Sequence, residues 1–293
     1  MRNLGYYNGK IGPLEEMQMP ILDRAVYFGD GVYDAAYAVH HTIVALEDHI
    51  DRFFSSFQKL KIPFSMTRAQ LAETLQKLVD QVEDSTSLFV YWQVSRGSGN
   101  RNHVFPAAEI PANLMVMVEP DPLTPIQKTF CAITVEDTRF FHCDIKTLNL
   151  IPNVMAAQQA KEAGCEEAIF HRGDLVTECA HSNVSILKDG VFRTAPLSRL
   201  ILSGTVRKHL IRLAAQEGIP VEQTSFTVQE LLDADEVIVH NCGTLCNAIN
   251  EIDGKQVGGG APDLLRKLQD ASIREFEEET HVKFSDYTGQ LHP

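Results

Sequence analysis

The chain of 293 residues contains one segment that neither a helix nor a strand can cross, Glu119-Pro120-Asp121-Pro122-Leu123-Thr124-Pro125. Proline fixes φ and lacks an amide hydrogen, so closely spaced prolines interrupt both kinds of hydrogen-bonded structure. We therefore expect a connection between two domains here, since a chain of this length can form two substantial cores. The expected division is a small domain at 1–119, a linker at 120–125, a larger domain at 126–277 and a C-terminal tail at 278–293.

The first part has the patterns of an α+β domain. Apolar side chains form one helical stripe from Leu46 to Leu60, and Pro63 prevents a long extension of that helix. Thr67 and Gln70 have the spacing of a capping box before a second helix. Residues that this second helix should bury are Leu71, Leu75, Leu78, Val79 and Val82. The aliphatic and aromatic segments 88–94 and 114–118 predict strands.

The second part alternates short strands with helices. Strands are expected at 131–135, 168–170, 183–187, 191–193 and 235–240, with a hairpin turn at Asp189-Gly190. Helices are expected at 154–163, from 203–205 to 218, and at 264–276. Asn153 is the expected N-cap of the first of these helices and Gly164 its C′ residue. The second should turn Val206, Leu210, Ile211 and Ala214 inward.

Charge and hydropathy restrict the class of partner. The formal net charge of −13 argues against nucleic acid or an anionic membrane as a partner. Residues 1–7 lack the apolar run of a signal peptide, and no stretch is long and apolar enough to span a bilayer. We therefore expect a cytoplasmic protein that acts on small molecules.

The six cysteines lie at 131, 143, 165, 179, 242 and 246, without the spacing of a paired framework. Free thiols in a reducing cytoplasm are the simplest expectation. Cys242 and Cys246 lie close to His240, but no second pair of ligands accompanies them. We expect no metal site.

Lys146 and Glu178 are the first candidates for chemistry. Lys146 lies among β-branched neighbours in Asp144-Ile145-Lys146-Thr147, a poor setting for a solvated surface charge. An amine that attacks an aldehyde needs a partly desolvated pocket, because desolvation favours the neutral nucleophile. A carboxylate such as Glu178 can pair with the ring nitrogen of pyridoxal phosphate (PLP) and keep it protonated. Alone, each residue has a plain alternative, a surface lysine and a solvated turn carboxylate.

Several longer motifs occur in one order along the chain. They are Tyr7-Asn8-Gly9, Asp23-Arg24-Ala25-Val26-Tyr27-Phe28-Gly29-Asp30-Gly31-Val32-Tyr33, His49-Ile50-Asp51-Arg52, the lysine segment, and Thr177-Glu178 with Ser182-Asn183-Val184. With these motifs the chain resembles the class IV (fold type IV) PLP-dependent aminotransferases, and most closely the bacterial D-amino acid aminotransferases, from Tyr7 to about Phe276. The resemblance implies an α/β (α+β) fold of two domains, the larger with a β-barrel-like core.

The resemblance also implies roles for single residues around the cofactor. Lys146 is the lysine that attaches to the PLP aldehyde and moves a proton, and Glu178 is the partner of the ring nitrogen. Arg52 binds the cofactor phosphate, for which a guanidinium has suitable geometry. Its alternative as a helical residue is a weak surface pair with Asp48.

The expected phosphate site departs from the family at two places. The Gly204-Thr205-Val206 turn opens a helix whose free N–H groups suit a phosphate, but Val206 stands where relatives usually have a threonine. Cys242, in His240-Asn241-Cys242-Gly243-Thr244, replaces a residue of a Ser/Thr-rich segment. We therefore expect backbone N–H groups to hold the phosphate at both places. His181 occupies a position beside the cofactor ring where this subfamily often has a small residue, and no role is assigned to it.

Arg101 and His103 form an Arg-x-His motif that resembles the substrate-carboxylate site of the D-amino acid aminotransferases. In that family the motif reaches across a homodimer interface and acts with the tyrosine that matches Tyr33. A guanidinium and an imidazole are suited to a carboxylate anion. The alternatives are a polar loop for Arg101 and His103 and a core residue for Tyr33.

The expected reaction is amino-group exchange between D-alanine and 2-oxoglutarate. A branched-chain L-amino acid aminotransferase is the next hypothesis, although the Arg-x-His motif is not expected in it. A carbon–carbon lyase acting on aminodeoxychorismate would use the same cofactor and lysine. A PLP-binding or structural dimer without activity would not need Lys146 and Glu178 together.

Overall fold

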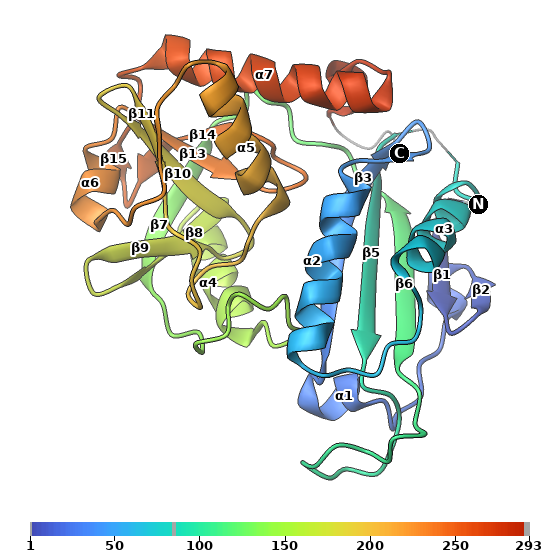
Figure 1. Ribbon diagram of the computed structural model, residues 1–293. Coiled ribbons are helices and arrows are strands. Elements are labelled where there is room, and N and C mark those ends of the chain that lie inside the picture. The colour runs from blue at the N-terminus through green and yellow to red at the C-terminus, as the bar shows by residue number, and fades with distance from the viewer. Residues whose placement is uncertain (1, 84–85, 290–293) are drawn as a thin grey trace. The chain divides into compact units, whose positions relative to one another are not determined.

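The computed structural model describes residues 2–83 and 86–289, and the chain forms two compact units (Figure 1). Unit 1 comprises Met1–Leu123, Ile145–Asn149 and Glu279–Pro293, and unit 2 comprises Thr124–Asp144 and Leu150–Glu278. The short segment around Lys146 joins unit 1 because Tyr33 N donates a hydrogen bond to Lys146 O and Val32 bridges Thr147. Among the described residues, no helix has the length and apolar character needed to cross a membrane.

Unit 1 is built on an antiparallel sheet of six strands. Its order is β2 (Lys10–Gly12), β1 (Leu4–Tyr7), β6 (Asn113–Pro120), β5 (Leu88–Ser95), β3 (Gly31–Val39) and β4 (Thr42–Ile43). Helices α2 (Leu46–Lys59) and α3 (Arg68–Val79) cover one face of it (Figure 1). The core between them includes Phe53 and Trp92, both fully buried. The short helices α1 (Arg24–Phe28) and η1 (Leu14–Glu16) complete the unit with η2 (Phe284–Tyr287).

Most of the expected elements of unit 1 are confirmed. The stripe of α2 buries Ile50, Phe53 and Phe57, whereas Leu60 is half-buried because it caps the helix. Both hydrogen bonds of the capping box at Thr67 are present. Strand β6 continues to Pro120, which pairs with Leu88, so the expected end at 118 was too early. A proline can end a strand although it cannot continue one.

Unit 2 contains a mixed sheet of nine strands. Its order is β12 (Val221–Glu222), β11 (Val191–Thr194), β10 (Asn183–Lys188), β13 (Glu236–His240), β14 (Asn247–Ile252), β7 (Phe130–Glu136), β8 (Glu167–Arg172) and β9 (Leu175–Cys179), with β15 (Lys255–Gln256) beside β14. Cys179 N donates to Ser182 O, which brings the end of β9 to the start of β10. The sheet thus curls back on itself, as the expected barrel-like core requires. The helices of this unit are α4 (Ile151–Glu162), α5 (Thr205–Gln216), α6 (Val228–Leu232) and α7 (Pro262–Thr280).

Helix boundaries in unit 2 differ from the expected ones. Helix α4 begins at Ile151 and its N-cap is Leu150, so the expected cap at Asn153 is wrong. Pro152 fits the first turn, where its missing N–H has no helical partner to lose. The side chain of Asn153 instead donates to Ala180 O, at 2.6 Å. Gly164 has the expected positive φ, +79°, just beyond the helix.

The inward face of α5 and the length of α7 also differ. In α5, Leu210 and Ala214 are buried as expected, but Val206 and Ile211 are only half-buried. Thr205 and Arg207 are buried instead, so the helix is rotated relative to the face expected from its apolar residues. Helix α7 continues through the acidic residues 277–279 to Thr280, which is buried.

The expectation that all six cysteines are free is wrong for one pair. Cys131 and Cys165 form a disulfide with a Cα–Cα distance of 4.6 Å. Ala132 pairs with Glu167 in the parallel β7–β8 ladder, which brings the preceding parts of the chain together. The two residues are 34 positions apart in sequence, so their spacing gives no sign of the pairing. The other four cysteines are free.

Candidate active site

Lys146 lies in unit 1 against an aromatic pair. Its Nζ is 4.3 Å from the centroid of the Tyr33 ring, and Tyr33 stacks on Tyr91 at 5.4 Å. The backbone of Lys146 is fixed from two sides, since Lys146 N donates to Ser56 Oγ and Lys146 O accepts from Tyr33 N. The side chain is half-buried. A fixed backbone and an aromatic wall leave the amine as the movable part of this residue.

Arg52 takes part in a buried cluster with Asp34 and His49. Asp34 is fully buried and accepts hydrogen bonds from Arg52 Nε at 2.8 Å and Arg52 Nη2 at 2.6 Å. His49 Nδ1 lies 2.8 Å from Asp34 Oδ1. Burial alone would raise the pKa of Asp34, but the charge and hydrogen bonds of Arg52, with the hydrogen bond of His49, hold it well below its usual value. Burial lowers the pKa of His49, so the cluster contains one carboxylate, one guanidinium and a neutral imidazole.

Arg101 and His103 lie on the exposed loop between β5 and β6 and contact α1. The Phe28 ring is 5.2 Å from Arg101 Cζ and 5.0 Å from the His103 ring, measured to its centroid. The loop backbone is fixed by Arg24 Nη1, which donates to Asn102 O, and by Tyr27 Oη, which donates to Gly99 O. Both candidate carboxylate-binding side chains are therefore on one anchored loop and open to solvent.

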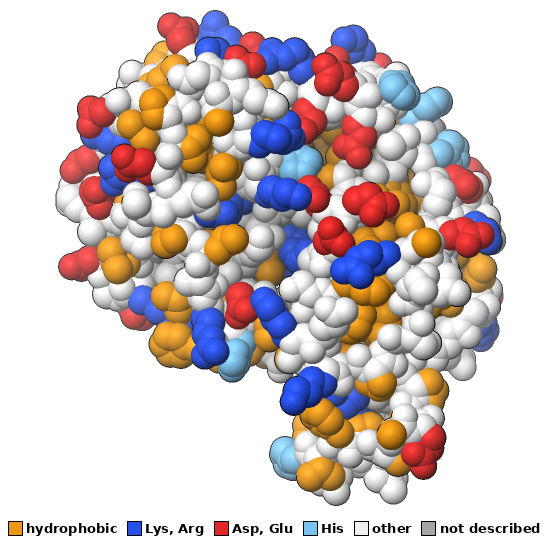
Figure 2. Space-filling model, in the orientation of Figure 1, with side chains coloured by type: hydrophobic (Ala, Val, Ile, Leu, Met, Phe, Trp, Pro, Cys, Tyr) orange, Lys and Arg blue, Asp and Glu red, His pale blue; other side chains and the backbone are white. Residues whose placement is uncertain are grey.

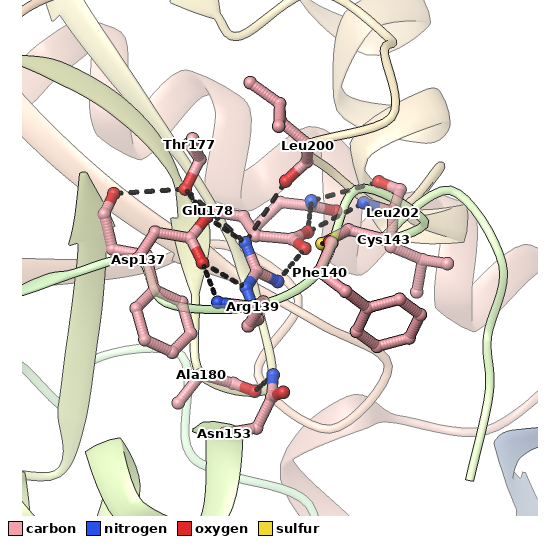
Figure 3. Close-up of polar contacts among 12 residues, drawn as sticks. Asp137, Arg139, Phe140, Cys143, Asn153, Thr177, Glu178, Ala180, Leu200 and Leu202 are labelled. Carbon is pink, nitrogen blue, oxygen red and sulfur yellow. Dashed lines mark hydrogen bonds and ion pairs between the residues drawn. The ribbon is translucent and has the colours of Figure 1, made fainter. Parts of the chain in front are cut away.

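Glu178 lies at the end of β9 in unit 2 and is only 5% exposed (Figure 3). Its Oε1 accepts a hydrogen bond from Arg139 Nη1 at 2.5 Å. Its Oε2 accepts from Asn183 Nδ2 and from Leu202 N, both at 2.9 Å. Donors on both oxygens, one of them a guanidinium, favour the ionised carboxylate.

Arg139 is itself held by Asp137. Arg139 Nε donates to Asp137 Oδ1 and Arg139 Nη2 to Asp137 Oδ2, both at 2.9 Å (Figure 3). Arg172 Nε donates to the same Oδ2 at 3.1 Å. Burial opposes the charge on each group, yet hydrogen bonds from Arg139 and Arg172 lower the pKa of Asp137, and Asp137 and Glu178 raise that of Arg139. Four charges of alternating sign thus stabilise one another.

The segment expected to hold a phosphate lies at the start of α5. Gly204 is its N-cap, and a Cβ atom there would lie 1.9 Å from Asn183 Oδ1, so only glycine fits. The first helical N–H groups have no partner within a helix, which makes this turn suited to an anion. Arg207 adds positive charge, because its Nη2 donates to two neutral oxygens and its buried Nε has no hydrogen-bond partner in the part of the chain that the structure describes. Burial lowers the pKa of Arg207. These features fit a phosphate group.

The second expected phosphate segment is arranged differently. Asn241 Oδ1 accepts hydrogen bonds from Gly243 N at 2.7 Å and Thr244 N at 3.1 Å. Two of the N–H groups expected to hold the phosphate are therefore used inside the turn, because an Asn side chain readily bonds to N–H groups just after it. Cys242 is half-buried in this turn.

Known proteins share both the sequence and the fold. Residues 31–252 match the family described as amino-transferase class IV. The chain belongs to the class IV aminotransferases. A D-alanine aminotransferase of Listeria monocytogenes (strain 10403S) is 39% identical over 86% of this class IV aminotransferase and 89% of the relative. One of Staphylococcus haemolyticus is 35% identical over 90% and 95%.

Solved structures agree with this fold. The branched-chain aminotransferase of Thermoproteus uzoniensis with norvaline has a TM-score of 0.83 at 22% identity, over 95% of each chain. The branched-chain amino acid aminotransferase of Escherichia coli has a TM-score of 0.80 at 21% identity, over 92% of this chain and 93% of that one. Two units with these sheets are thus the fold of this aminotransferase family.

Two groups of residues at the site were missed by the sequence analysis. Arg139 and Asp137 were not identified as partners of Glu178, because they are 39 or more positions away in sequence. Asp34 was missed as well, although a charged residue within the apolar strand Val32–Val39 is a visible signal of a buried ion pair. His181 has its Nδ1 3.3 Å from Glu167 Oε2 and is largely exposed.

Proposed function

We propose that this protein is a PLP-dependent D-amino acid transaminase, which exchanges the amino group between a D-amino acid such as D-alanine and a 2-oxo acid such as 2-oxoglutarate. The observation that carries this proposal is the identity of 35–39% with D-alanine aminotransferases over 86–90% of the chain. The branched-chain aminotransferases of known structure reach only 21–25%. The Arg101-x-His103 motif supports the same choice.

Lys146 would carry the reaction. When bound, PLP supplies an aldehyde that forms a bond with an amine and a ring that accepts electrons from the substrate Cα. Lys146 Nζ would attach to that aldehyde and, once displaced by the substrate amine, would take the proton from Cα and return it on the other carbon of the exchange. Its contact with the Tyr33 ring supports this role, because an aromatic wall tolerates both the charged and the neutral amine.

Glu178 and the start of α5 would bind the two polar ends of the cofactor. The ionised Glu178 would accept a hydrogen bond from the protonated ring nitrogen. Arg52, Thr205, Val206 and Cys242 would surround the phosphate, with Arg52 providing charge and the first turn of α5 providing N–H groups. Whether these groups serve one cofactor molecule belongs to the proposal.

Substrate would be recognised by its carboxylate. Arg101, His103 and Tyr33 supply a guanidinium, an imidazole and a hydroxyl for it. Because Arg101 and His103 are exposed on a projecting loop, we propose that they serve the active site of a second copy in a homodimer. Apolar side chains exposed around this loop and α1 support such an interface, and Figure 2 shows hydrophobic surface on this part of unit 1. They are Ile21, Leu22, Val26, Val104 and Phe105.

Val104→Asp tests the interface, since a charge on a buried apolar contact opposes association. Sedimentation should show a dimer for the parent protein and a monomer for the variant. A parent protein that sediments as a monomer would contradict the homodimer. We also propose a cytoplasmic location, which the four free cysteines support and the Cys131–Cys165 disulfide opposes. Titration of thiols in protein taken from its native cell under acid quench decides between them.

The function is tested by two measurements on the full chain. Borohydride reduction in the presence of PLP, followed by peptide mapping, should label Lys146. D-Alanine with 2-oxoglutarate should then give pyruvate and D-glutamate, whereas L-leucine should not react. Release of pyruvate from aminodeoxychorismate without an amino acceptor would instead identify the lyase.

A further inference from the structure

A buried row of charges leads from the surface of unit 2 to Glu178. The exposed fractions of its side chains are 20% for Arg172, 0% for Asp137, 6% for Arg139 and 7% for Glu178. Each neighbour in this row forms an ion pair with the next (Figure 3). The proposed function uses only the last member, so the presence of three further buried charges needs an explanation.

We propose that Arg139 is a positioning residue that keeps Glu178 ionised and oriented, so that this carboxylate pairs with the ring nitrogen of the cofactor even at acidic pH. The inference rests on the proposed function, in which Glu178 accepts the hydrogen bond of that nitrogen. It assigns to Arg139 a role through Glu178 and no contact with the cofactor itself.

Burial makes a charge partner necessary. A carboxylate that is almost fully removed from water is strongly disfavoured unless a hydrogen-bonded opposite charge accompanies it. Asn183 and Leu202 N satisfy Oε2 but are neutral, and Arg139 is the cation that bonds to Oε1. Removal of this cation should therefore let Glu178 take up a proton at a higher pH.

Other ionisable groups near Glu178 do not replace Arg139. They are Arg207 on α5, Cys143 in the loop after β7, Cys179 on β9, and Asp137 beyond Arg139. Burial raises the pKa of Cys143 to about 11 and that of Cys179 well above its usual value, so both thiols are neutral. Arg207 acts on Glu178 only through space, and its hydrogen bonds go to Ala195 O and Gln223 Oε1.

Asp137 explains the orientation of the guanidinium. It accepts from Nε and from Nη2, while Leu200 O accepts from Nη2 at 3.1 Å. These bonds fix the plane of Arg139 and direct Nη1 to Glu178. The planar fork of arginine provides such fixed directions, which lysine does not.

The proton balance gives a measurable consequence. A protonated ring nitrogen and an ionised Glu178 share one proton between them. When Glu178 already carries a proton, binding of the protonated ring requires the release of one proton, and the affinity falls as the pH is lowered. Without Arg139 this fall should begin at a higher pH.

The test compares PLP with an analogue in which the ring nitrogen is replaced by C–H. The aldehyde and phosphate are identical in both, so the ratio of their dissociation constants reports the ring nitrogen alone. In the full-length parent protein, PLP should bind about tenfold or more tightly than the analogue from acidic to alkaline pH. In Arg139→Gln the preference should persist at alkaline pH and disappear at acidic pH. In Glu178→Gln it should be absent throughout.

Matched variants separate this role from a general disturbance of the cluster. Asp137→Asn removes a buried charge from the same row but leaves Arg139 beside Glu178, so it should keep the parent profile. Arg139→Lys should largely keep it, and Arg139→Met is a second neutral variant if Arg139→Gln does not fold. An unchanged profile in the neutral variants, or the same shift in Asp137→Asn, would overturn the inference. Failure of borohydride to label Lys146 in the parent protein would instead overturn the proposed function.

Discussion

Lys146 and Glu178 are surrounded in opposite ways. Glu178 is nearly fully buried and bonded through both oxygens to a guanidinium, an amide and a backbone N–H. Lys146 is half-buried, its amine lies over an aromatic ring, and among the described residues no carboxylate forms an ion pair with it. One ionisable group is thus held in one charge state and position, while the other has freedom to move.

This difference agrees with the proposed chemistry. A group that shuttles protons must change its protonation state, which a strong ion pair would prevent. A group that stabilises charge on a ring acts best when it is fixed before the reaction. The contrast predicts that changes at Lys146 remove chemistry, whereas changes in the buried clusters alter stability, affinity and pH dependence.

Lys146→Ala should have the largest effect on activity. Loss of proton transfer alone should lower kcat by about 10²–10⁴-fold, and loss of covalent attachment should lower it further. The measurement is the rate of D-alanine transamination, together with the absorbance of the bound cofactor. Lys128→Ala is the matched control, because Lys128 Nζ also lies over an aromatic ring, that of Phe130 at 5.0 Å. Full activity in Lys146→Ala would remove the basis of the comparison.

Asp34→Asn tests the buried cluster that holds Arg52. Removing one partner of a buried pair should cost about 3–5 kcal/mol in the free energy of unfolding at neutral pH. Folding lowers the pKa of Asp34, so its contribution is fully present above the pKa of the unfolded chain, about 3.9, and is lost as the pH falls further. The stability difference between parent and variant should therefore be constant at neutral pH and shrink below about pH 4.

Denaturant unfolding at several pH values measures this difference. Asp51→Asn is the control, because Asp51 pairs with Arg68 at the surface, where their side chains are 65% and 51% exposed. Such a pair contributes about 0–1 kcal/mol. Equal losses in the two variants would mean that burial does not distinguish the Asp34 cluster.

The sequence predicted the elements that repeat a pattern and missed those that depend on distant partners. Helices α2 and α3 follow from their stripes and from the capping box at Thr67. Strand β3 was not predicted, because three of its nine residues are alanines, which have low strand propensity, and its place between β4 and β5 decides its conformation.

The site shows the same limit. The motifs identify Lys146 and Glu178 as candidates, but the pairing of Arg139 with Glu178 depends on β7 and β9 flanking β8. The face of α5 was misjudged because a buried arginine, Arg207, replaces an apolar residue on the inward side. A buried charge can be recognised only after its surroundings are known.

Arg101→Ala should reduce recognition of substrate without affecting either fixed cluster. Losing a charge-assisted contact to the substrate carboxylate should cost about 1.5–3 kcal/mol, or roughly ten- to a hundredfold in kcat/KM for D-alanine. The affinity for PLP should stay within about twofold, since this residue is assigned to the substrate. Arg68→Ala is the matched control, because Arg68 also lies over an aromatic ring, that of Phe54 at 4.5 Å. Normal turnover of D-alanine by Arg101→Ala would remove the main residue-level support for D-amino acid specificity.

Val206→Thr should have the smallest effect and concerns the fixed side of the comparison. Val206 is half-buried in the first turn of α5, where relatives usually have a hydroxyl, and the exchange is nearly isosteric. One added hydrogen bond to a phosphate should contribute at most about 1.5–3 kcal/mol, and less after the hydroxyl is desolvated. The measurement is the dissociation constant of pyridoxamine phosphate, which has no covalent link to Lys146 and therefore reports the non-covalent contacts alone. Val206→Ala controls for loss of the methyl groups and should bind no more tightly than the parent. Tighter binding only in Val206→Thr would place this side chain at the phosphate, whereas unchanged or weaker binding would mean that Val206 faces elsewhere and that Arg52 and the N–H groups of α5 act without it.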